Sequence, residues 1–245
     1  MSLIRPKKGK QGRWPYALLL FFFPLILFFS FRWLVIETFV IPSESMVPNL
    51  FIHDHILVQK YVYGIKPMMG DGWLINWSEP KRGDVVVFRY PDNRDVFFIK
   101  RLVGLPGDKI EVKGMNVKVN GELLDLKPIE NPVQDISFRV AFQPDAQYYS
   151  EKLGDTDHFV RFEGNSASDF EMEAKTFEVA PNSYFVMGDN RYNSQDSRFW
   201  GNLPKDLLVG RARYIWFSCE KMLEAAPYIC DPLSLRLERL FKTIN

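Results

Sequence analysis

The sequence predicts a mainly β protein that follows one amino-terminal transmembrane helix. The helix is predicted by residues 14–31, an 18-residue stretch without a charged side chain. The β body is predicted by short runs from His55 onward that are rich in Val, Ile, Phe and Tyr and are interrupted by Gly, Pro, Asp and Asn. A chain of 245 residues, 47% of them hydrophobic, is long enough to bury one core and a smaller second domain.

The apolar character resumes after Arg32, and the predicted membrane span covers residues 14–36. A bilayer is crossed by about 20 apolar residues, and a proline such as Pro24 is tolerated in such a helix. The alternative is a cleaved signal peptide, whose apolar region has roughly 7–15 residues and ends at small side chains. Here Phe31, Arg32 and Trp33 follow instead, so an uncleaved anchor is the prediction.

Basic residues before the span set its predicted orientation. No acidic residue lies among them, and they are Arg5, Lys7, Lys8, Lys10 and Arg13. Because positive charge is retained on the cytoplasmic side of a membrane, residues 1–13 are predicted to be a cytoplasmic tail and residues 37–245 an exported body. Over the whole chain 31 basic residues nearly balance 30 acidic residues, so nucleic acid is not an expected partner.

The body contains a series of predicted strands. They are residues 56–62, 85–90, 96–103, 109–112, 117–119, 177–179, 184–186 and 211–217. Asn120-Gly121 predicts a tight hairpin turn between two of them. Leucines in 233–241 predict a short amphipathic helix, and the more polar region 130–175 predicts a surface β region or a long loop.

The cysteines and histidines lack the spacing of a metal site, and neither a metal nor a cofactor is implied. Cys219 and Cys230 are compatible with a disulfide in an exported domain and equally with two buried thiols. We interpret the run from His53 to His55 as a turn at the entrance to a strand, and His158 as a surface residue.

Two serines lie between prolines just after the predicted span, in Pro42-Ser43-Glu44-Ser45-Met46-Val47-Pro48. The prolines restrict the local backbone, which suits a fixed nucleophile. Taken by itself the pattern is equally typical of an ordinary loop, because short motifs often match by chance.

Lys100 and Arg101 lie next to each other inside the apolar run 96–103. Alternation along a strand places each of them among apolar neighbours on its own face. A lysine in apolar surroundings has a pKa below its usual value of about 10.4 and can act as a base, whereas arginine stays protonated. Lys100 is therefore the candidate base and Arg101 a candidate ion-pair residue. The alternative is an edge strand whose basic groups reach solvent.

A polar loop follows the predicted strand 184–186. Its ten consecutive polar side chains run from Asp189 to Arg198, between Gly188 and Trp200. An ordinary turn needs fewer hydrogen-bonding groups, so a rigid support for a site is the second interpretation.

Taken in this order, the three segments resemble bacterial type I signal peptidases, a family of membrane-anchored Ser/Lys proteases. The resemblance spans most of residues 39–217. The matching motifs are Pro42-Ser43-Glu44-Ser45-Met46 with Pro48, Arg82-Gly83-Asp84-Val85-Val86-Val87-Phe88, Lys100-Arg101 with Gly104-Leu105-Pro106-Gly107-Asp108, and Gly188-Asp189-Asn190 through Asp196-Ser197-Arg198. The resemblance implies a β-rich protease core with a smaller β insertion, here at residues 106–182, and removal of signal peptides after residues of Ala-X-Ala type.

The resemblance also implies roles for single residues. Ser45 is the expected nucleophile and Lys100 the expected general base, with the Ser43 hydroxyl and the Ser45 N–H as the oxyanion hole. The expected supporting residues are Ser194, which orients the amine, and the ion pair of Asp196 and Arg198. The residues expected to line the substrate pockets are Ile41, Pro42, Met46, Leu50, Phe98 and Ile99. The expected partners are signal peptides and the bacterial inner membrane, with the catalytic body on its periplasmic side.

Glu44 departs from the commonest form of the motif, in which glycine precedes the nucleophile, and one predicted span stands where some members have two. One rival prediction is a Ser-His-Asp hydrolase that uses the histidines at positions 53 and 55. Another is a membrane-tethered binding domain, which would leave the lysine in the apolar strand without a purpose. The aromatic-rich segment 61–77 is either a hydrophobic hairpin or a contact with the membrane interface.

Overall fold

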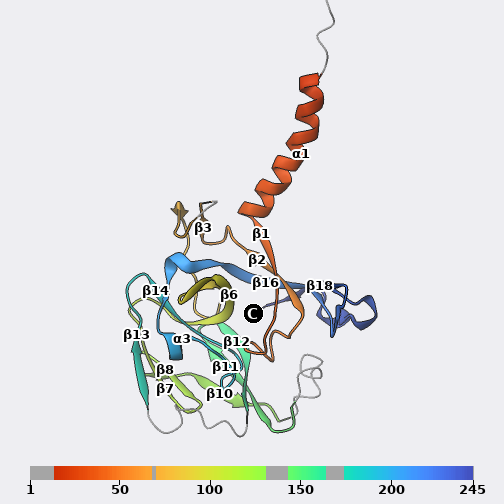
Figure 1. The fold of residues 1–245 in the computed structure, drawn as a ribbon. Helices are drawn as coiled ribbons and strands as arrows, with labels where there is room; N and C mark the ends of the chain where they lie inside the picture. Colours follow the sequence, from red (N-terminus) through yellow and green to blue (C-terminus); the bar gives the residue numbers. More distant parts are fainter. Residues whose placement is uncertain (1–13, 68–69, 131–142, 164–173, 245) are drawn as a thin grey trace, which may run out of the picture.

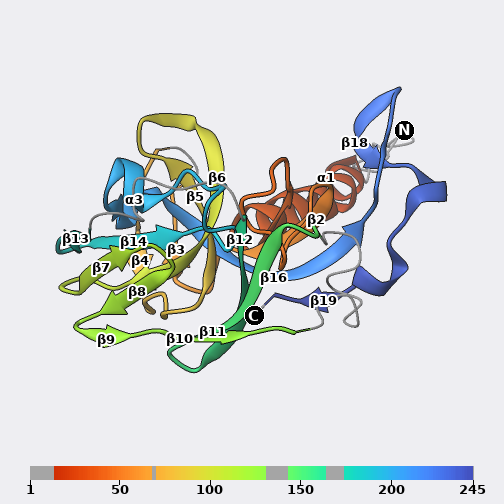
Figure 2. The same ribbon diagram turned by 90° about the horizontal axis from the view of Figure 1, so that it is seen from below.

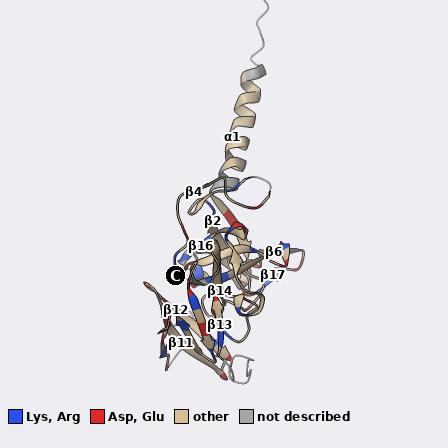
Figure 3. Ribbon diagram, turned by 90° about the vertical axis from the view of Figure 1, so that its left-hand side faces the viewer, with Lys and Arg blue, Asp and Glu red and all other residues tan. Residues whose placement is uncertain are grey.

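The computed structural model describes residues 14–67, 70–130, 143–163 and 174–244. The chain begins with helix α1 (Trp14–Leu34), which projects from a body made of strands (Figure 1). Its described side chains are almost all exposed and carry no charge (Figure 3). Among the described residues, we find no helix whose length and apolar character suffice to cross a membrane. The helix ends two residues before the predicted limit at Ile36, and the predicted tail 1–13 lies outside the described residues.

An antiparallel sheet of eight strands forms the centre of the body, in the order β1-β2-β16-β5-β6-β14-β15 with β19 paired to β16. Their bounds are β1 (Ile36–Val40), β2 (Asp54–Gln59), β5 (Val85–Tyr90), β6 (Asn93–Gly104), β14 (Ser183–Met187), β15 (Leu203–Pro204), β16 (Leu208–Ser218) and β19 (Lys242–Thr243). Strand β6 is buried from Ile99 to its end, so its carboxyl half lies in the core while its amino half is exposed. One apolar cluster fills the space between this sheet and the loop after β1.

Two smaller antiparallel sheets are inserted between β6 and β14 (Figure 2). The first contains β7 (Lys109–Lys113), β8 (Asn116–Val119), β9 (Glu122–Leu123) and β13 (Lys175–Glu178). The second contains β10 (Asp125–Pro128), β11 (Ala146–Leu153) and β12 (Thr156–Glu163). All of these strands lie within the span 106–182 in which the sequence predicts an insertion. Of the region 130–175, β11, β12 and the first residue of β13 are strands, in agreement with the predicted surface β region.

Each predicted strand is present, with ends that differ by a few residues. The hairpin turn is also confirmed: β8 pairs with β9 on either side of Asn120 and Gly121. Both turn residues have positive φ, 54° and 85°, which Asn and Gly adopt at the lowest cost.

The remaining elements are short. They are β3 (Gly64–Ile65), β4 (Ile75–Asn76), α3 (Ser197–Trp200), β17 (Met222–Leu223), β18 (Ala226–Cys230), and the 3₁₀ turns η2 (Lys205–Leu207), η3 (Pro232–Ser234) and η4 (Leu237–Arg239).

The prediction of an amphipathic helix at residues 233–241 was wrong. The segment forms η3 and η4, while Leu233 and Leu237 are 96% and 65% exposed. The side chains directed inward are Arg236 and Arg239, which bond to the protein interior. Buried polar contacts therefore determine this segment's conformation, and its leucine spacing does not.

Candidate active site

Ser45 and Lys100 meet in space although 55 positions separate them in sequence. Ser45 lies in the turn after β1, and Lys100 lies on β6 opposite Val86 of β5. Lys100 Nζ is 2.6 Å from Ser45 Oγ, and both residues are buried. Ser43 Oγ lies 3.3 Å from Ser45 Oγ. The structure therefore brings a hydroxyl and an amine into hydrogen-bond contact, as nucleophilic catalysis requires.

Burial lowers the pKa of the Lys100 amine to about 8, although the nearby carboxylates of Asp196 and Asp189 act in the opposite direction. The amine also lies 5.4 Å from the centre of the Phe98 ring, on the apolar side of the site. At pH 7 a group with this pKa is neutral in about one molecule in ten, whereas free lysine is neutral in fewer than one in a thousand. The strand environment therefore produces a usable base.

Arg101 forms a buried ion pair, as the sequence predicted. Its Nε and Nη2 atoms each lie 2.8 Å from one carboxylate oxygen of Asp189. Asn49 Nδ2 donates to the same carboxylate at 2.7 Å, and the Asn190 N–H donates to the Ser45 carbonyl at 3.1 Å. The ion pair thus connects β6 to both the serine turn and the polar loop after β14.

The polar loop packs directly against the serine turn at Gly188. A Cβ atom at this position would lie 2.2 Å from Ser194 Oγ and 2.5 Å from the Ser45 carbonyl oxygen, so only glycine permits this approach. The Gly188 N–H donates to Asp196 at 2.9 Å, and Asp196 pairs with Arg198 at 2.8 Å. Burial alone would raise the pKa of Asp196, but the Arg198 guanidinium and these donors hold it below its usual range.

Ser194 is buried beside this ion pair. Its Oγ is close enough to Asp196 to help lower the pKa of that carboxyl, yet it satisfies hydrogen-bond geometry with none of the described residues. Its expected contact with the Lys100 amine is therefore not formed in this structure.

A groove of about 330 Å³ opens beside Ser45 and Lys100. Its lining residues are Pro42, Ser43, Glu44, Ser45, Val96, Phe97, Phe98, Ile99, Lys100, Asn193 and Gln195. Three of the expected substrate-pocket residues, Pro42, Phe98 and Ile99, line this groove. The other three, Ile41, Met46 and Leu50, belong to the core cluster beneath it, which also contains Ile99.

The histidines lie apart from this groove, and among the described residues no hydrogen bond joins a histidine to Ser45. The surface position predicted for His158 was wrong, since this residue is 3% exposed. Its Nε2 lies 3.1 Å from Glu151, which pairs with Arg191. Acidic neighbours in the sequence suggested solvent, but β11 and β12 bring the ring to buried charged partners instead.

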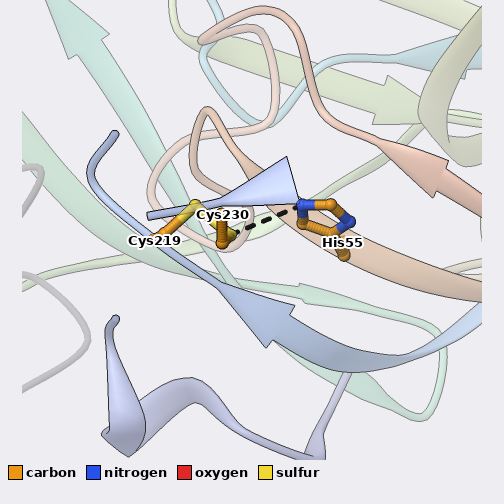
Figure 4. Close-up of side chains that lie close together, drawn as sticks. All are labelled: His55, Cys219 and Cys230. Carbon is orange, nitrogen blue, oxygen red and sulfur yellow. Dashed lines mark hydrogen bonds between the residues drawn. A yellow bond between two sulfur atoms is a disulfide. The ribbon is translucent and has the colours of Figure 1, made fainter. Parts of the chain in front are cut away.

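The described residues contain one cluster with metal-ligand side chains, formed by His55, Cys219 and Cys230 (Figure 4). The two cysteines form a disulfide, which resolves the alternatives left by the sequence, and His55 Nε2 lies 3.5 Å from Cys230 Sγ. Cysteine binds a metal ion as the thiolate, a form that a disulfide does not supply. The disulfide therefore joins the end of β16 covalently to the end of β18.

Comparison with known proteins connects this site to a family. Residues 14–217 match the family model described as signal peptidase, peptidase S26. The chain belongs to this family. It is 40% identical over 210 residues to a signal peptidase I of Pseudomonas aeruginosa, with 80% of this chain and 70% of that protein covered. It is 32% identical over 235 residues to a signal peptidase I of Aquifex aeolicus, with 86% and 87% covered.

A solved signal peptidase I structure from Enterococcus faecalis V583 shares 24% identity and covers 55% of this chain and 97% of its own. The TM-score of this pair is 0.33.

The last residues of the chain lie beyond the part that matches the signal peptidase family model, yet they contact the serine turn. Arg239 pairs with Asp54 and donates to the Asn49 carbonyl at 2.9 Å. Arg236 donates to the Ile52 carbonyl at 3.0 Å. We call these two arginines the carboxyl-terminal clamp. Sequence reasoning missed the clamp, since an arginine pattern near the end of a chain is usually a solvated face.

Proposed function

We propose that this member of the signal peptidase family removes amino-terminal signal peptides from exported preproteins and cuts after small residues of Ala-X-Ala type. In this proposal Ser45 is the nucleophile and Lys100 the general base. The observation that carries it is the 2.6 Å contact between the Ser45 hydroxyl and a buried Lys100 amine at the wall of an open groove.

The proposed reaction begins when the neutral Lys100 amine removes the Ser45 proton during attack of Oγ on the scissile carbonyl. The Ser43 hydroxyl and the Ser45 N–H stabilise the oxyanion that develops on the carbonyl oxygen. When the intermediate collapses, the Lys100 ammonium donates its proton to the leaving amine. Water then hydrolyses the acyl-enzyme, with Lys100 again acting as the base. Asp196 and Arg198 hold the loop that bears Ser194, and Ser194 orients the amine once substrate is bound.

The unpaired edge of β6 supports the proposed substrate position. Strand β6 pairs with β5 over most of its length but with β14 only from Arg101 onward, so one edge of residues 96–100 lacks a strand partner among the described residues. An extended peptide adds to such an edge through backbone hydrogen bonds. Its small side chains then contact Pro42, Phe98 and Ile99, and the buried Ile41, Met46 and Leu50 restrict the depth of the pockets.

The direct test is incubation of the full-length protein in detergent with a preprotein, followed by mass spectrometry of the products. We expect one cut, directly after an Ala-X-Ala-type sequence. Cuts scattered along the preprotein, or no cut, would contradict the proposed function.

The pH dependence of kcat/KM is expected to follow the Lys100 amine. Since its pKa lies near 8 and the neutral form is the base, kcat/KM should rise about tenfold per pH unit below pH 8 and level off above it. Initial cleavage rates of a peptide substrate between pH 6 and pH 10 give the profile. A rise centred near the free-lysine value of about 10.4 would contradict the assignment.

We also propose that residues 14–36 anchor the protein in the bacterial inner membrane, with the amino terminus in the cytoplasm and the body on the periplasmic side. The support is the uncharged stretch 14–31 and the basic residues before it. Strand β4 lies at the end of the body nearest to α1 (Figure 3), and the exposed residues Leu74, Ile75 and Trp77 belong to this strand or flank it, so they would contact the membrane interface. Protease added to spheroplasts should digest the body. A body that is protected until the membrane is lysed would show the opposite orientation.

A further inference from the structure

Glu44 places a carboxylate on the wall of the groove, between Ser43 and Ser45. Its side chain is 44% exposed, so it is accessible to solvent. Of the lining residues that the structure describes, Glu44 is the acidic one and Lys100 the basic one. In the reactive form of the enzyme, in which the Lys100 amine is neutral, Glu44 is the one charged residue among these described lining residues.

The nearest cation is shared between Glu44 and a second carboxylate. Arg161 Nη2 forms an ion pair with Glu44 Oε2 at 3.5 Å and a closer one with Glu163 Oε1 at 2.6 Å, so one guanidinium faces two carboxylates. Arg161 is 1% exposed, and its backbone is held between Asp189 and Arg191. Asn190 Nδ2 donates to the Glu44 carbonyl and to Glu163, both at 3.3 Å. These contacts hold the Glu44 backbone in place, and the single guanidinium leaves one unit of negative charge on the two carboxylates together.

We propose that Glu44 is a specificity-determining residue for the amine side of the scissile bond. It favours substrates with a basic residue directly after the cut and disfavours substrates with an acidic one. This inference rests on the proposed function of the groove.

The side of the cut follows from the proposed path of the substrate. The residues before the cut lie along the apolar residues 96–99 of β6, and the chain after the cut continues past the turn that bears Ser45 and Glu44. Cleavage also creates an α-amino group there, which with a pKa of about 7.7–8.0 is largely protonated at neutral pH. A carboxylate at this position attracts both this ammonium and a basic side chain next to it.

The test uses the full-length protein and three peptides that differ only in the residue after the cut, which is Lys, Gln or Glu. For the unaltered protein we expect the kcat/KM for the Lys peptide to exceed that for the Glu peptide by about fivefold to tenfold at low salt, and by less in 0.5 M NaCl. In Glu44→Gln this ratio should fall to between about one and two. In Glu163→Gln it should fall as well, because Arg161 then pairs with Glu44.

Glu37→Gln is the matched control, since Glu37 pairs with Lys60 on the surface away from the groove, and its ratio should equal that of the unaltered protein. Thermal melting confirms that each variant is folded. If the unaltered protein cleaves all three peptides with equal kcat/KM, or if Glu44→Gln keeps the full ratio, the inference is overturned while the proposed function stands. If it cleaves neither these peptides nor a preprotein, both are overturned.

Discussion

Ser45→Ala and Lys100→Ala should each reduce kcat/KM for a preprotein by about 10⁴-fold or more, because each removes one half of a unit that acts together. The double variant should be little worse than either single variant, since removing the second partner of a broken pair costs almost nothing further. Ser43→Ala should cost less, about 10²–10³-fold, if its hydroxyl is one of two oxyanion donors. Rates of preprotein cleavage by the purified full-length variants give these ratios.

Lys100→Arg distinguishes a base from a merely positive group at this position. Guanidinium stays protonated at any working pH, so this variant should be as inactive as Lys100→Ala. His55→Ala is the matched control, because His55 is also buried but contacts the disulfide instead of Ser45. Near-normal activity of Lys100→Ala, or loss of catalysis in His55→Ala without loss of folding, would overturn the assignment and restore the histidine alternative.

The β body was readable from the sequence because its strands carry local signals. Apolar runs broken by turn residues gave every predicted strand, and Asn120-Gly121 gave the hairpin turn between β8 and β9. The proximity of Lys100 to Ser45 had no local signal, and only the ordered set of motifs indicated it. The burial of Lys100 did have a local signal, because Lys100 and Arg101 lie inside an apolar run, and a basic side chain in apolar surroundings requires a compensating contact.

The errors have a common physical cause, which is the pairing of charges on different elements that the fold brings together. His158 was predicted to be exposed because Asp155 and Asp157 flank it, but Glu151 on the neighbouring strand provides a buried partner. The carboxyl-terminal helix was predicted from leucine spacing, but Arg236 and Arg239 turn inward to groups about 185 positions earlier. Local periodicity contains no information about such pairs.

Asp54 is the centre of the contacts made by the carboxyl-terminal clamp. It is fully buried and accepts hydrogen bonds from the Phe51 N–H at 2.8 Å, from Ser218 Oγ at 2.6 Å and from Arg239 Nε at 3.0 Å. Arg239 also covers the ring of Phe51, with 3.8 Å between guanidinium carbon and ring centre. The segment between Ser45 and β2 is therefore fixed by residues at the far end of the chain.

Arg239→Met should lower the free energy of unfolding by about 3–5 kcal/mol, because it leaves the Asp54 carboxylate buried without its cation. For a protein of this size the loss corresponds to a fall in Tm of roughly 10 °C, measured by thermal unfolding of the full-length protein in detergent. Lys221→Met is the matched control: Lys221 is exposed in the same carboxyl-terminal region and should leave Tm within about 2 °C of its original value.

The double variant Asp54→Asn with Arg239→Met shows whether the stability lost in Arg239→Met comes from an unpaired buried charge or from lost packing. Asparagine still accepts from Phe51 and Ser218 but carries no charge, so the double variant should be more stable than Arg239→Met alone. If the two changes together cost as much as their separate effects added, the pair contributes through packing instead of charge.

At a temperature where Arg239→Met stays folded, its kcat should still fall, because the Asn49 carbonyl loses its donor and the Ser45 turn is held less firmly. An Arg239→Met protein with unchanged Tm and unchanged kcat would contradict the role given to the carboxyl-terminal clamp.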